Sequence, residues 1–334
     1  MKNVHLIAAA RPNFMKVAPL YHALKKTDWC NPKIAYTGQH RDDNMSGALM
    51  RDLGIAPDDL DGDVDAVVVP GDVRDARKAA IQAAYLGIPL VHLEAGLRSG
   101  DTAMPEEVNR IIIDHVSDLL WTPSEDADAN LELEAVRGKV ECVGNIMIDA
   151  FEMMRPKIEA IPPMEGPYAV VTLHRPSNVD DPVKLRELLD EVRCLSKELP
   201  VVFPVHPRTY KRIDSMDLNM LPNVEIRGPM PYVEFMSLVK NAAIVITDSG
   251  GVQEETSYLG VPCATVRENT ERPITISHGT NCLIRPDEIV GAARLALTGD
   301  WKKGKPIPLW DGKTADRCVD SLKRFLLPQK GLDQ

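Results

Sequence analysis

The sequence lacks the features that mark disulfide-stapled, zinc-binding and membrane-spanning proteins. Its six cysteines stand far apart, and none of them belongs to a CxxC pair. We therefore expect reduced thiols, as in a cytoplasmic protein, with no disulfide framework and no metal site. No apolar run approaches the length of a membrane span, and the apolar N-terminal stretch is too short for a signal peptide. We expect a first β-strand there and no membrane partner.

An excess of basic residues is also missing. The 334-residue chain has 49 acidic and 39 basic side chains, which gives a formal net charge of −10. Nucleic-acid-binding proteins usually present a basic face, so we expect no nucleic-acid partner. A small anionic ligand is compatible with this charge, because it needs only a local cluster of Arg, Lys and backbone N–H groups. No GxGxxG fingerprint and no metal-ligand spacing occurs, so we expect no NAD and no other cofactor.

Short apolar segments alternate with helical patterns over most of the chain. The predicted strands are residues 4–9, 33–36, 66–69, 90–93 and 139–143 in a first series, and 169–173, 201–205, 224–226, 243–246 and 263–266 in a second. Such alternation is typical of parallel sheets with helices on both faces. The two series predict an α/β fold with two doubly wound, Rossmann-like domains.

The domain boundary is predicted from a helix-breaking segment. Residues 161–167 contain three prolines and a glycine, which end any helix that reaches them. We expect an N-terminal domain over residues 1–160 and a C-terminal domain over residues 161–313. A last helical pattern begins at residue 314, and we expect the segment 314–334 to pack back on the N-terminal domain.

Unusual polar residues stand just after most of the predicted strands. They are Arg11, Lys16, Gln39, His40, Asp72 and Glu94 in the first series, and His174, Arg175, His206, Asp248 and the loop 267–273 in the second. Ligands of open parallel sheets bind at the carboxyl ends of the strands. The two parallel sheets are therefore expected to face one shared cleft with these loops.

The run from Thr247 to Glu255 is the most informative of these turns. An apolar strand is followed by Ser249, Gly250 and Gly251, and then by a helical pattern. A helix N-terminus offers free N–H groups and a positive dipole end to a phosphate, and glycine lets the anion approach. Glu255 falls about one turn into the helix, where it could accept hydrogen bonds from ribose. The alternative is an ordinary strand-to-helix turn with a Ser or Asp N-cap.

The ordered set of motifs resembles the non-hydrolysing UDP-N-acetylglucosamine 2-epimerases, which have the two-domain glycosyltransferase-B architecture. The matching motifs are Arg11-Pro12 with Lys16, Thr37–His40, Gly71-Asp72, His92–Arg98, Pro105–Arg110, Thr172–Arg175, Pro204–Pro207, Asp248–Glu255 and Thr270–Pro273. The resemblance implies the interconversion of UDP-GlcNAc and UDP-ManNAc. It also implies a route in which UDP is eliminated to give a glycal and then added again, with a proton delivered to the opposite face.

The resemblance carries roles over to individual residues. The implied catalytic residues are Asp72, Glu94, Glu106 and His174. The implied substrate- and UDP-binding residues are Arg11, Lys16, Arg110, Arg175, His206, Ser249, Gly250, Gly251, Glu255 and Arg272. Carboxylates near the sugar C2 would move protons, and the cations would neutralise the leaving diphosphate.

Several of these residues have a second interpretation. Asp72 could instead be the N-cap of a helix that starts near Val73, and Glu106 could be a first-turn residue that interacts with the helix dipole. Glu94 has no such alternative, because a carboxylate at the end of an apolar strand is costly unless it is used. His92 is interpreted as a packed strand histidine.

The chain also departs from the family pattern. Family members usually place a further helix before the strand that leads to Gly71, but here only residues 56–63 fill that interval. We therefore do not expect the second, activating UDP-GlcNAc that some bacterial members bind with that segment. Residues 73–77 replace a run of Thr or Ser/Asn, and Ala9, Asn13 and Ser177 also differ. A sister subgroup acts on diacetamido-uronic acid nucleotides.

The expected function is a cytoplasmic sugar-nucleotide 2-epimerase, a homodimer that supplies polysaccharide synthesis and takes a UDP-sugar as its substrate. One alternative is a hydrolysing epimerase, which releases the free sugar and UDP. A second is a glycosyltransferase on the same architecture, although such an enzyme needs no acid/base set around C2. The third is a UDP-sugar-binding protein with decayed catalysis.

Overall fold

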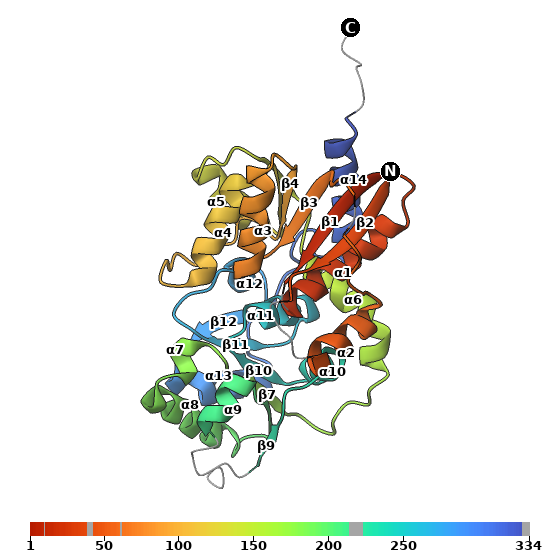
Figure 1. The fold of residues 1–334 in the computed structure, drawn as a ribbon. Helices are drawn as coiled ribbons and strands as arrows, with labels where there is room; N and C mark the ends of the chain where they lie inside the picture. Colours follow the sequence, from red (N-terminus) through yellow and green to blue (C-terminus); the bar gives the residue numbers. More distant parts are fainter. Residues whose placement is uncertain (10, 39–42, 61, 214–222, 329–334) are drawn as a thin grey trace. The chain divides into compact units, whose positions relative to one another are not determined.

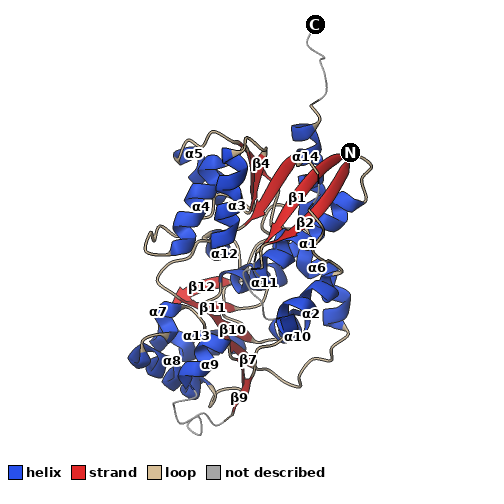
Figure 2. Cartoon of the chain, viewed as in Figure 1, coloured by secondary structure: helices blue, strands red, loops and turns tan. Residues whose placement is uncertain are grey.

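The computed structural model describes residues 1–9, 11–38, 43–60, 62–213 and 223–328; for residues 11, 43–46, 207 and 211 it describes the backbone alone. The chain forms two compact units. The first unit consists of Met1–Met154 with Pro308–Gln334, and the second of Arg155–Ile307. Strands and helices alternate along the chain in both units (Figures 1 and 2).

The first unit contains a six-stranded sheet with the order β2-β1-β3-β4-β5-β6. Its strands are β1 (Lys2–Ala8), β2 (Cys30–Tyr36), β3 (Ala66–Pro70), β4 (Leu90–Leu93), β5 (Leu119–Thr122) and β6 (Lys139–Cys142). Its helices are α1 (Arg11–Lys25), α2 (Asp43–Leu53), α3 (Arg74–Tyr85), α4 (Pro105–Val116), α5 (Glu125–Leu133), most of α6 (Ile146–Glu159) and α14 (Thr314–Leu326). The described strand pairs are parallel, which explains why β3 reads as a short continuous apolar run and why β4 is apolar except for His92.

The second unit contains another six-stranded parallel sheet, with the order β12-β11-β10-β7-β8-β9. Its strands are β7 (Ala169–Thr172), β8 (Val201–Pro204), β9 (Val224–Arg227), β10 (Ile244–Thr247), β11 (Cys263–Val266) and β12 (Asn281–Ile284). Its helices are α7 (Pro176–Val179), α8 (Pro182–Leu195), α9 (Pro207–Ile213), α10 (Tyr232–Lys240), α11 (Gly250–Leu259), α12 (Ile274–Ser277), a short 3₁₀ turn at Pro286–Glu288 and α13 (Ile289–Thr298). The switch in strand order lies between β7 and β10, whose ends carry His174 and Asp248.

The predicted fold class is confirmed, and ten of the twelve strands had been expected. The prediction missed β5 and β12. β5 follows α4 after only Ser117 and Asp118, with no Gly or Pro to separate the two elements. β12 has four residues, one of them a buried asparagine, and thus little apolar signal.

The unit boundaries differ from the expected ones. The chain passes from the first unit to the second within α6, between Met154 and Arg155, whereas the sequence placed the boundary after residue 160. The helix-breaking prolines follow the end of α6 at Glu159. From Arg155 onward, however, the chain already groups with the second unit and no longer with the first. The second unit ends at Ile307, before the expected residue 313.

Buried polar contacts attach α14 to the first unit. The indole Nε1 of Trp121, on β5, donates to the Ser321 hydroxyl at 2.8 Å. The backbone N–H of Ala315 donates to the Asp149 carboxylate on α6 at 2.8 Å, and Arg317 donates to the carbonyl of Val143 at 2.6 Å. Because Trp121 and Ser321 are both almost fully buried, water cannot replace their hydrogen bond.

The Trp121–Ser321 bond gives a stability prediction. Ser321→Ala leaves the buried indole N–H without its acceptor, so we expect the free energy of unfolding to fall by about 1–3 kcal/mol. Urea denaturation followed by circular dichroism measures this change. Asp320→Ala on the exposed face of the same helix is the matched control, and its effect should stay within about 0.5 kcal/mol. Equal stability of the two variants would contradict this role for Ser321.

Among the described helices, none combines the length and apolar character needed to cross a lipid bilayer.

Candidate active site

Glu94 is the most constrained of the predicted catalytic residues. It directly follows β4, its residue surface is 6% exposed, and its carboxylate forms an ion pair with Lys16 of α1. Its backbone φ is +71°, a left-handed conformation that a residue with a side chain seldom adopts. Such strain persists only where the surroundings enforce it, and it occurs most often at functional sites. The geometry therefore singles out Glu94 more strongly than its sequence position did.

Gly71, which precedes Asp72, makes room for the Lys16–Glu94 pair. Its φ is +64°, and a Cβ added there would lie 2.7 Å from Lys16 Nζ. Glycine is needed at this position both for its conformation and for the close approach of Lys16.

Asp72 belongs to a chain of ion pairs and is not a helix cap. The N-cap of α3 is Val73, so the N-cap interpretation of Asp72 is wrong. Its half-buried carboxylate instead pairs with Arg110 of α4, and Arg110 Nη2 donates to Glu107 at 2.6 Å. Arg110 is only 2% exposed. Its partners here are carboxylates, so it holds and orients Asp72, and a direct contact with UDP stays a prediction.

Glu107, which the sequence reasoning did not single out, connects this chain to the loop after Glu94. Its carboxylate accepts hydrogen bonds from the backbone N–H groups of Ser99 and Gly100 at 2.9–3.0 Å. Burial alone would raise the pKa of Glu107, but the bonds from Arg110 and these N–H groups hold the pKa below its ordinary value. These contacts favour the ionised form of Glu107, which pairs with Arg110 and holds it in place.

His92 is a packed strand histidine, as expected. It is fully buried, its Nε2 donates to the carbonyl of Gly71 at 2.9 Å, and its Nδ1 lies 2.5 Å from Asp114. Asp114 also accepts from the N–H of Gly96 and pairs with Arg98 at 2.7 Å. These contacts tie the loops after β3 and β4 to α4, so His92 and Asp114 position the loops that carry Asp72 and Glu94.

The remaining predicted residues of this unit include Glu106 and Arg11. Glu106 is exposed in the first turn of α4, one residue before the buried Glu107. Its catalytic role stays a prediction. Arg11 begins α1, but its side chain lies outside the described residues, as do Gln39 and His40.

In the second unit, Asp248 organises the loop after β7. Its carboxylate is fully buried and accepts hydrogen bonds from the backbone N–H groups of His174 (3.0 Å) and Arg175 (2.9 Å) and from Asn178 (3.1 Å). Burial alone would raise the pKa of Asp248, but the bond from His174 and the two N–H groups keep the pKa below its ordinary value. Asp248 therefore holds the His174-Arg175 pair as a charged acceptor.

The imidazole of His174 is oriented by the same carboxylate. Its Nδ1 lies 3.1 Å from Asp248 Oδ1, and since a carboxylate only accepts, Nδ1 must carry the proton. This leaves Nε2 as the ring atom that exchanges a proton or binds a ligand. The exposed ring of His206 lies beside it, with the two ring centroids 5.4 Å apart.

Three arginines surround Glu271. Arg175, Arg267 and Arg272 lie 3.1, 2.9 and 2.7 Å from its carboxylate oxygens. Burial alone would raise the pKa of Glu271, but these cations hold the pKa well below its ordinary value. Arg272 also pairs with the buried Glu254 at 2.8 Å. Arg267 was expected only as part of the loop 267–273 and was not assigned a binding role, because no sequence spacing indicates that it faces the other two arginines.

The cluster lies at the N-terminus of α11. Ser249 is the N-cap, and within the described part of the chain its hydroxyl makes no capping hydrogen bond. A Cβ added at Gly250 would lie 2.5 Å from Arg272 Nη1 and 2.7 Å from Glu271 Oε1. A Cβ at Gly251 would have no described atom within 4 Å. Gly250 thus admits the arginine cluster, and Gly251 leaves the helix end open.

The loop that carries Arg272 is fixed to α11 by a buried amide network. Gln253 of α11 accepts from the Thr270 hydroxyl at 2.7 Å and from Asn281 at 3.1 Å. The Thr270 hydroxyl in turn accepts from the backbone N–H of Arg272 at 3.1 Å. Gln253 is therefore a positioning residue for Arg272, which the sequence reasoning missed because its partners lie 17 and 28 residues away.

Glu255 is buried in the second turn of α11. The hydroxyl of Tyr232 donates to its carboxylate at 2.7 Å. Burial raises the pKa of Glu255 to about 8, the Tyr232 hydrogen bond lowers it, and the neighbouring charge of Glu254 raises it. In the ligand-free protein Glu255 therefore holds a proton at neutral pH.

This proton gives a pH prediction. The unfolded chain loses it near the ordinary pKa of 4.5, so between pH 4.5 and about 8 only the folded state binds it. The stabilisation that this proton gives to the folded state is fully present below pH 4.5. It is lost progressively as the pH rises from 4.5 through about 8. We expect urea denaturation without nucleotide to show a larger loss of stability from pH 6 to pH 8 in the wild type than in Glu255→Gln. The same pH dependence in both proteins would contradict a proton on Glu255.

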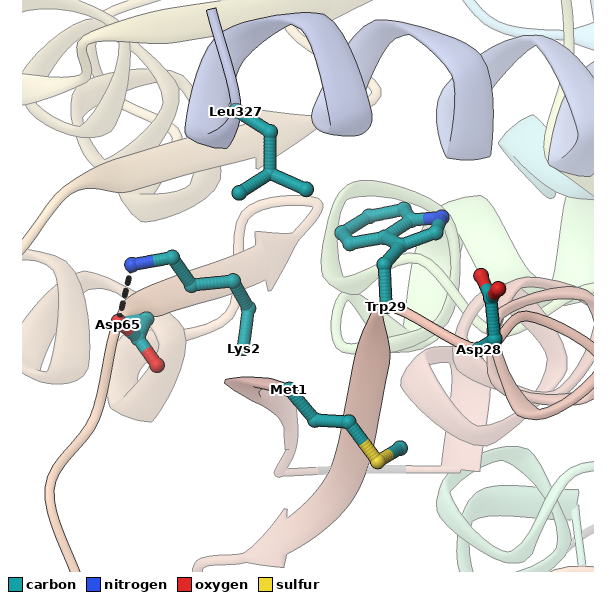
Figure 3. A pocket seen from close by; sticks show the side chains of 6 residues that line it. All are labelled: Met1, Lys2, Asp28, Trp29, Asp65 and Leu327. Carbon is teal, nitrogen blue, oxygen red and sulfur yellow. Dashed lines mark hydrogen bonds and ion pairs between the residues drawn. The ribbon is translucent and has the colours of Figure 1, made fainter.

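One pocket of the first unit contains none of the predicted site residues. It has a volume of about 270 Å³ and is lined by Met1, Lys2, Asp28, Trp29, Asp65 and Leu327 (Figure 3). Lys2 forms an ion pair with Asp65 at 2.7 Å on one side of it. Because Lys2 begins β1 and Trp29 precedes β2, this pocket lies at the amino end of the strands.

Known proteins resemble the chain over most of its length. The family model described as UDP-N-acetylglucosamine 2-epimerase matches residues 60–323. The chain is 33% identical to the UDP-N-acetylglucosamine 2-epimerase of Methanocaldococcus jannaschii, over 94% of this chain and 97% of that protein. It is 34% identical to the UDP-2,3-diacetamido-2,3-dideoxy-D-glucuronate 2-epimerase of Pseudomonas aeruginosa, over 87% and 91%.

Solved structures show the same likeness. The crystal structure of the M. jannaschii UDP-GlcNAc 2-epimerase in complex with UDP-GlcNAc and UDP has a TM-score of 0.85 and 32% identity to this chain. The match covers 96% of this chain and 99% of that one. The fold, the order of the motifs and the extent of these matches agree, and the chain therefore belongs to the UDP-N-acetylglucosamine 2-epimerase family and is an enzyme of the epimerase class.

Proposed function

We propose that this enzyme interconverts UDP-GlcNAc and UDP-ManNAc, or the C2 epimers of a closely related UDP-acetamido sugar, without net hydrolysis. The observation that carries the proposal is Glu94, a buried carboxylate with a strained backbone that pairs with Lys16. A carboxylate is a group that can take up a proton as a general base. The relatives named for this reaction support the substrate class.

The proposed reaction is an elimination followed by an addition. A carboxylate removes the proton from C2, and the electron pair of the C2–H bond forms the C1–C2 double bond of a glycal. At the same time the C1–O bond breaks, and its electron pair leaves with UDP. UDP then adds back to C1, and a proton is delivered to the opposite face of C2. We assign the proton transfers to Glu94, Glu106 and Asp72.

The second unit supplies groups that suit the nucleotide. We propose that Arg175, Arg272 and the N–H groups from Ser249 to Gly251 bind the diphosphate, because arginine and a helix N-terminus both favour phosphate. Arg11 would add a further cation. His174 would act through Nε2 at the leaving oxygen, Glu255 would accept from the ribose, and His206 would contact the nucleotide.

Product analysis tests the proposal against its alternatives. The purified protein is incubated with UDP-GlcNAc, and the products are separated by ion-exchange chromatography and identified by ³¹P and ¹H NMR. We expect UDP-ManNAc. Free ManNAc with a matching amount of UDP would indicate the hydrolysing alternative. No conversion of UDP-GlcNAc, with turnover of the diacetamido-glucuronate nucleotide, would assign the substrate of the Pseudomonas relative.

We further propose that the enzyme works in the cytoplasm as a homodimer and supplies polysaccharide synthesis. The widely separated cysteines support a reducing compartment. Light scattering coupled to gel filtration measures the oligomeric state, and a monomer mass would contradict the dimer.

A further inference from the structure

Glu271 lies where an anion is favoured. Its carboxylate contacts Arg175, Arg267 and Arg272 at 2.7–3.1 Å. It also lies 2.7 Å from the point that a Cβ of Gly250 would occupy, at the start of α11. A helix start and converging arginines are the groups that bind phosphate. A carboxylate of the chain itself therefore lies among groups of the kind that bind phosphate.

Two arginine N–H groups of the cluster have no acceptor among the described residues. Arg175 Nε and Arg267 Nη1 are buried, and among the described residues neither has a hydrogen-bond partner. The side chain of Arg267 is only 7% exposed, so water does not readily satisfy it. These two N–H groups are of the kind that hydrogen-bond to an anion.

The charges of the cluster nearly cancel. Three arginines face the two carboxylates Glu254 and Glu271, which leaves one net positive charge. Free UDP carries one negative charge more than a UDP-sugar, because loss of the sugar exposes a terminal phosphate oxygen. Without Glu271 the cluster would attract free UDP more than it attracts the UDP-sugar.

We infer that Glu271 is an internal counter-ion that limits the affinity of this site for diphosphates, most strongly for free UDP. The inference rests on the proposed assignment of the arginine cluster to the diphosphate. In this role Glu271 tunes the charge of the binding site, which differs from merely holding the loop 267–273 in place. By repelling the product of the elimination, it keeps the site from holding UDP too tightly for release.

The test is the affinity of Glu271→Gln for UDP and for inorganic pyrophosphate, measured by titration calorimetry at fixed ionic strength. Glutamine keeps the size and removes the charge. We expect both ligands to bind about tenfold more tightly than to the wild type. The affinity should also fall more steeply with added salt, because one more net charge is screened. Pyrophosphate shows whether the effect belongs to the phosphates and not to uracil or ribose.

Glu198→Gln is the matched control. Glu198 is in the same unit, it pairs with Arg294 at 2.7 Å, and its removal changes the net charge of the protein by the same amount. Its UDP affinity should equal that of the wild type. Glu271→Asp is the second variant if Glu271→Gln does not fold. The shorter side chain keeps the charge but withdraws it from α11, so UDP should again bind more tightly, although by less.

The outcomes separate the inference from the proposed function. Unchanged or weaker UDP binding by a folded Glu271 variant would overturn the inference, because Glu271 would then only position the arginines. A wild-type protein that binds no UDP would contradict the proposed function itself.

Discussion

Glu94→Gln is expected to lower the turnover of UDP-GlcNAc by a factor on the order of a hundred or more. Glutamine keeps the volume of the side chain but cannot take up a proton. The strained backbone and the ion pair with Lys16 hold the carboxylate in one place, so the loss is expected to come from the missing proton transfer. The rate of UDP-ManNAc formation measures the effect.

The same variant should keep its affinity for UDP. All groups that we assign to the nucleotide, apart from Arg11, belong to the unit formed by Arg155–Ile307, whereas Glu94 belongs to the other unit. Glu132→Gln, an exposed position on α5, is the control and should have wild-type turnover. Wild-type rates in both Glu94→Gln and Glu106→Gln would contradict the acid/base role of these two carboxylates, whereas absence of turnover in the wild type as well would favour a UDP-sugar-binding protein.

Gly250→Val should weaken UDP binding by about ten- to several-hundred-fold, or one to a few kcal/mol. The structure gives this effect a definite cause. The new side chain would occupy the space of the Arg272 guanidinium and the Glu271 carboxylate, so the arginine would leave the start of α11. Titration calorimetry with UDP measures the loss. Unchanged affinity would contradict a diphosphate site at this helix.

Gly251→Ala is an informative companion to that variant. A Cβ at Gly251 meets no described atom within 4 Å, so the thermal stability of the ligand-free protein should stay unchanged. Its UDP affinity should nevertheless fall, because the open space beside the helix end is where we place the phosphates. A stable Gly251→Ala protein with wild-type affinity would move the phosphates away from this turn.

The alternating pattern predicted the fold because parallel strands are buried on both faces and leave short apolar runs in the sequence. β3, with the sequence AVVVP, is fully buried and was easily recognised. β12 carries the polar Asn281, whose side chain is satisfied by Gln253 and Thr275, so its burial cannot be read from hydrophobicity. Strands of this kind are found only when their tertiary partners are known.

The contacts of the candidate site were visible in the sequence only in part, for a related reason. Residues next to glycine-rich turns, such as Asp72, Glu94 and Gly250, could be proposed because they follow strands, and their roles stay predictions. Glu107 and Asp248 were not assigned their roles, because each acts on a loop through buried hydrogen bonds. Asp248 lies 74 residues from His174 in the sequence, and no spacing rule joins the two.

The most direct test of the central claim is the incubation of the protein with UDP-GlcNAc in deuterated water, followed by ¹H NMR. If a carboxylate removes the C2 proton and exchanges it with the solvent, the group that returns to C2 is deuterium. We therefore expect deuterium at C2 in the UDP-ManNAc that forms and, with time, in the remaining UDP-GlcNAc. UDP-ManNAc that keeps the original hydrogen at C2 would contradict proton transfer through solvent-exchanging carboxylates. No deuterium and no UDP-ManNAc after long incubation would contradict epimerisation of this substrate.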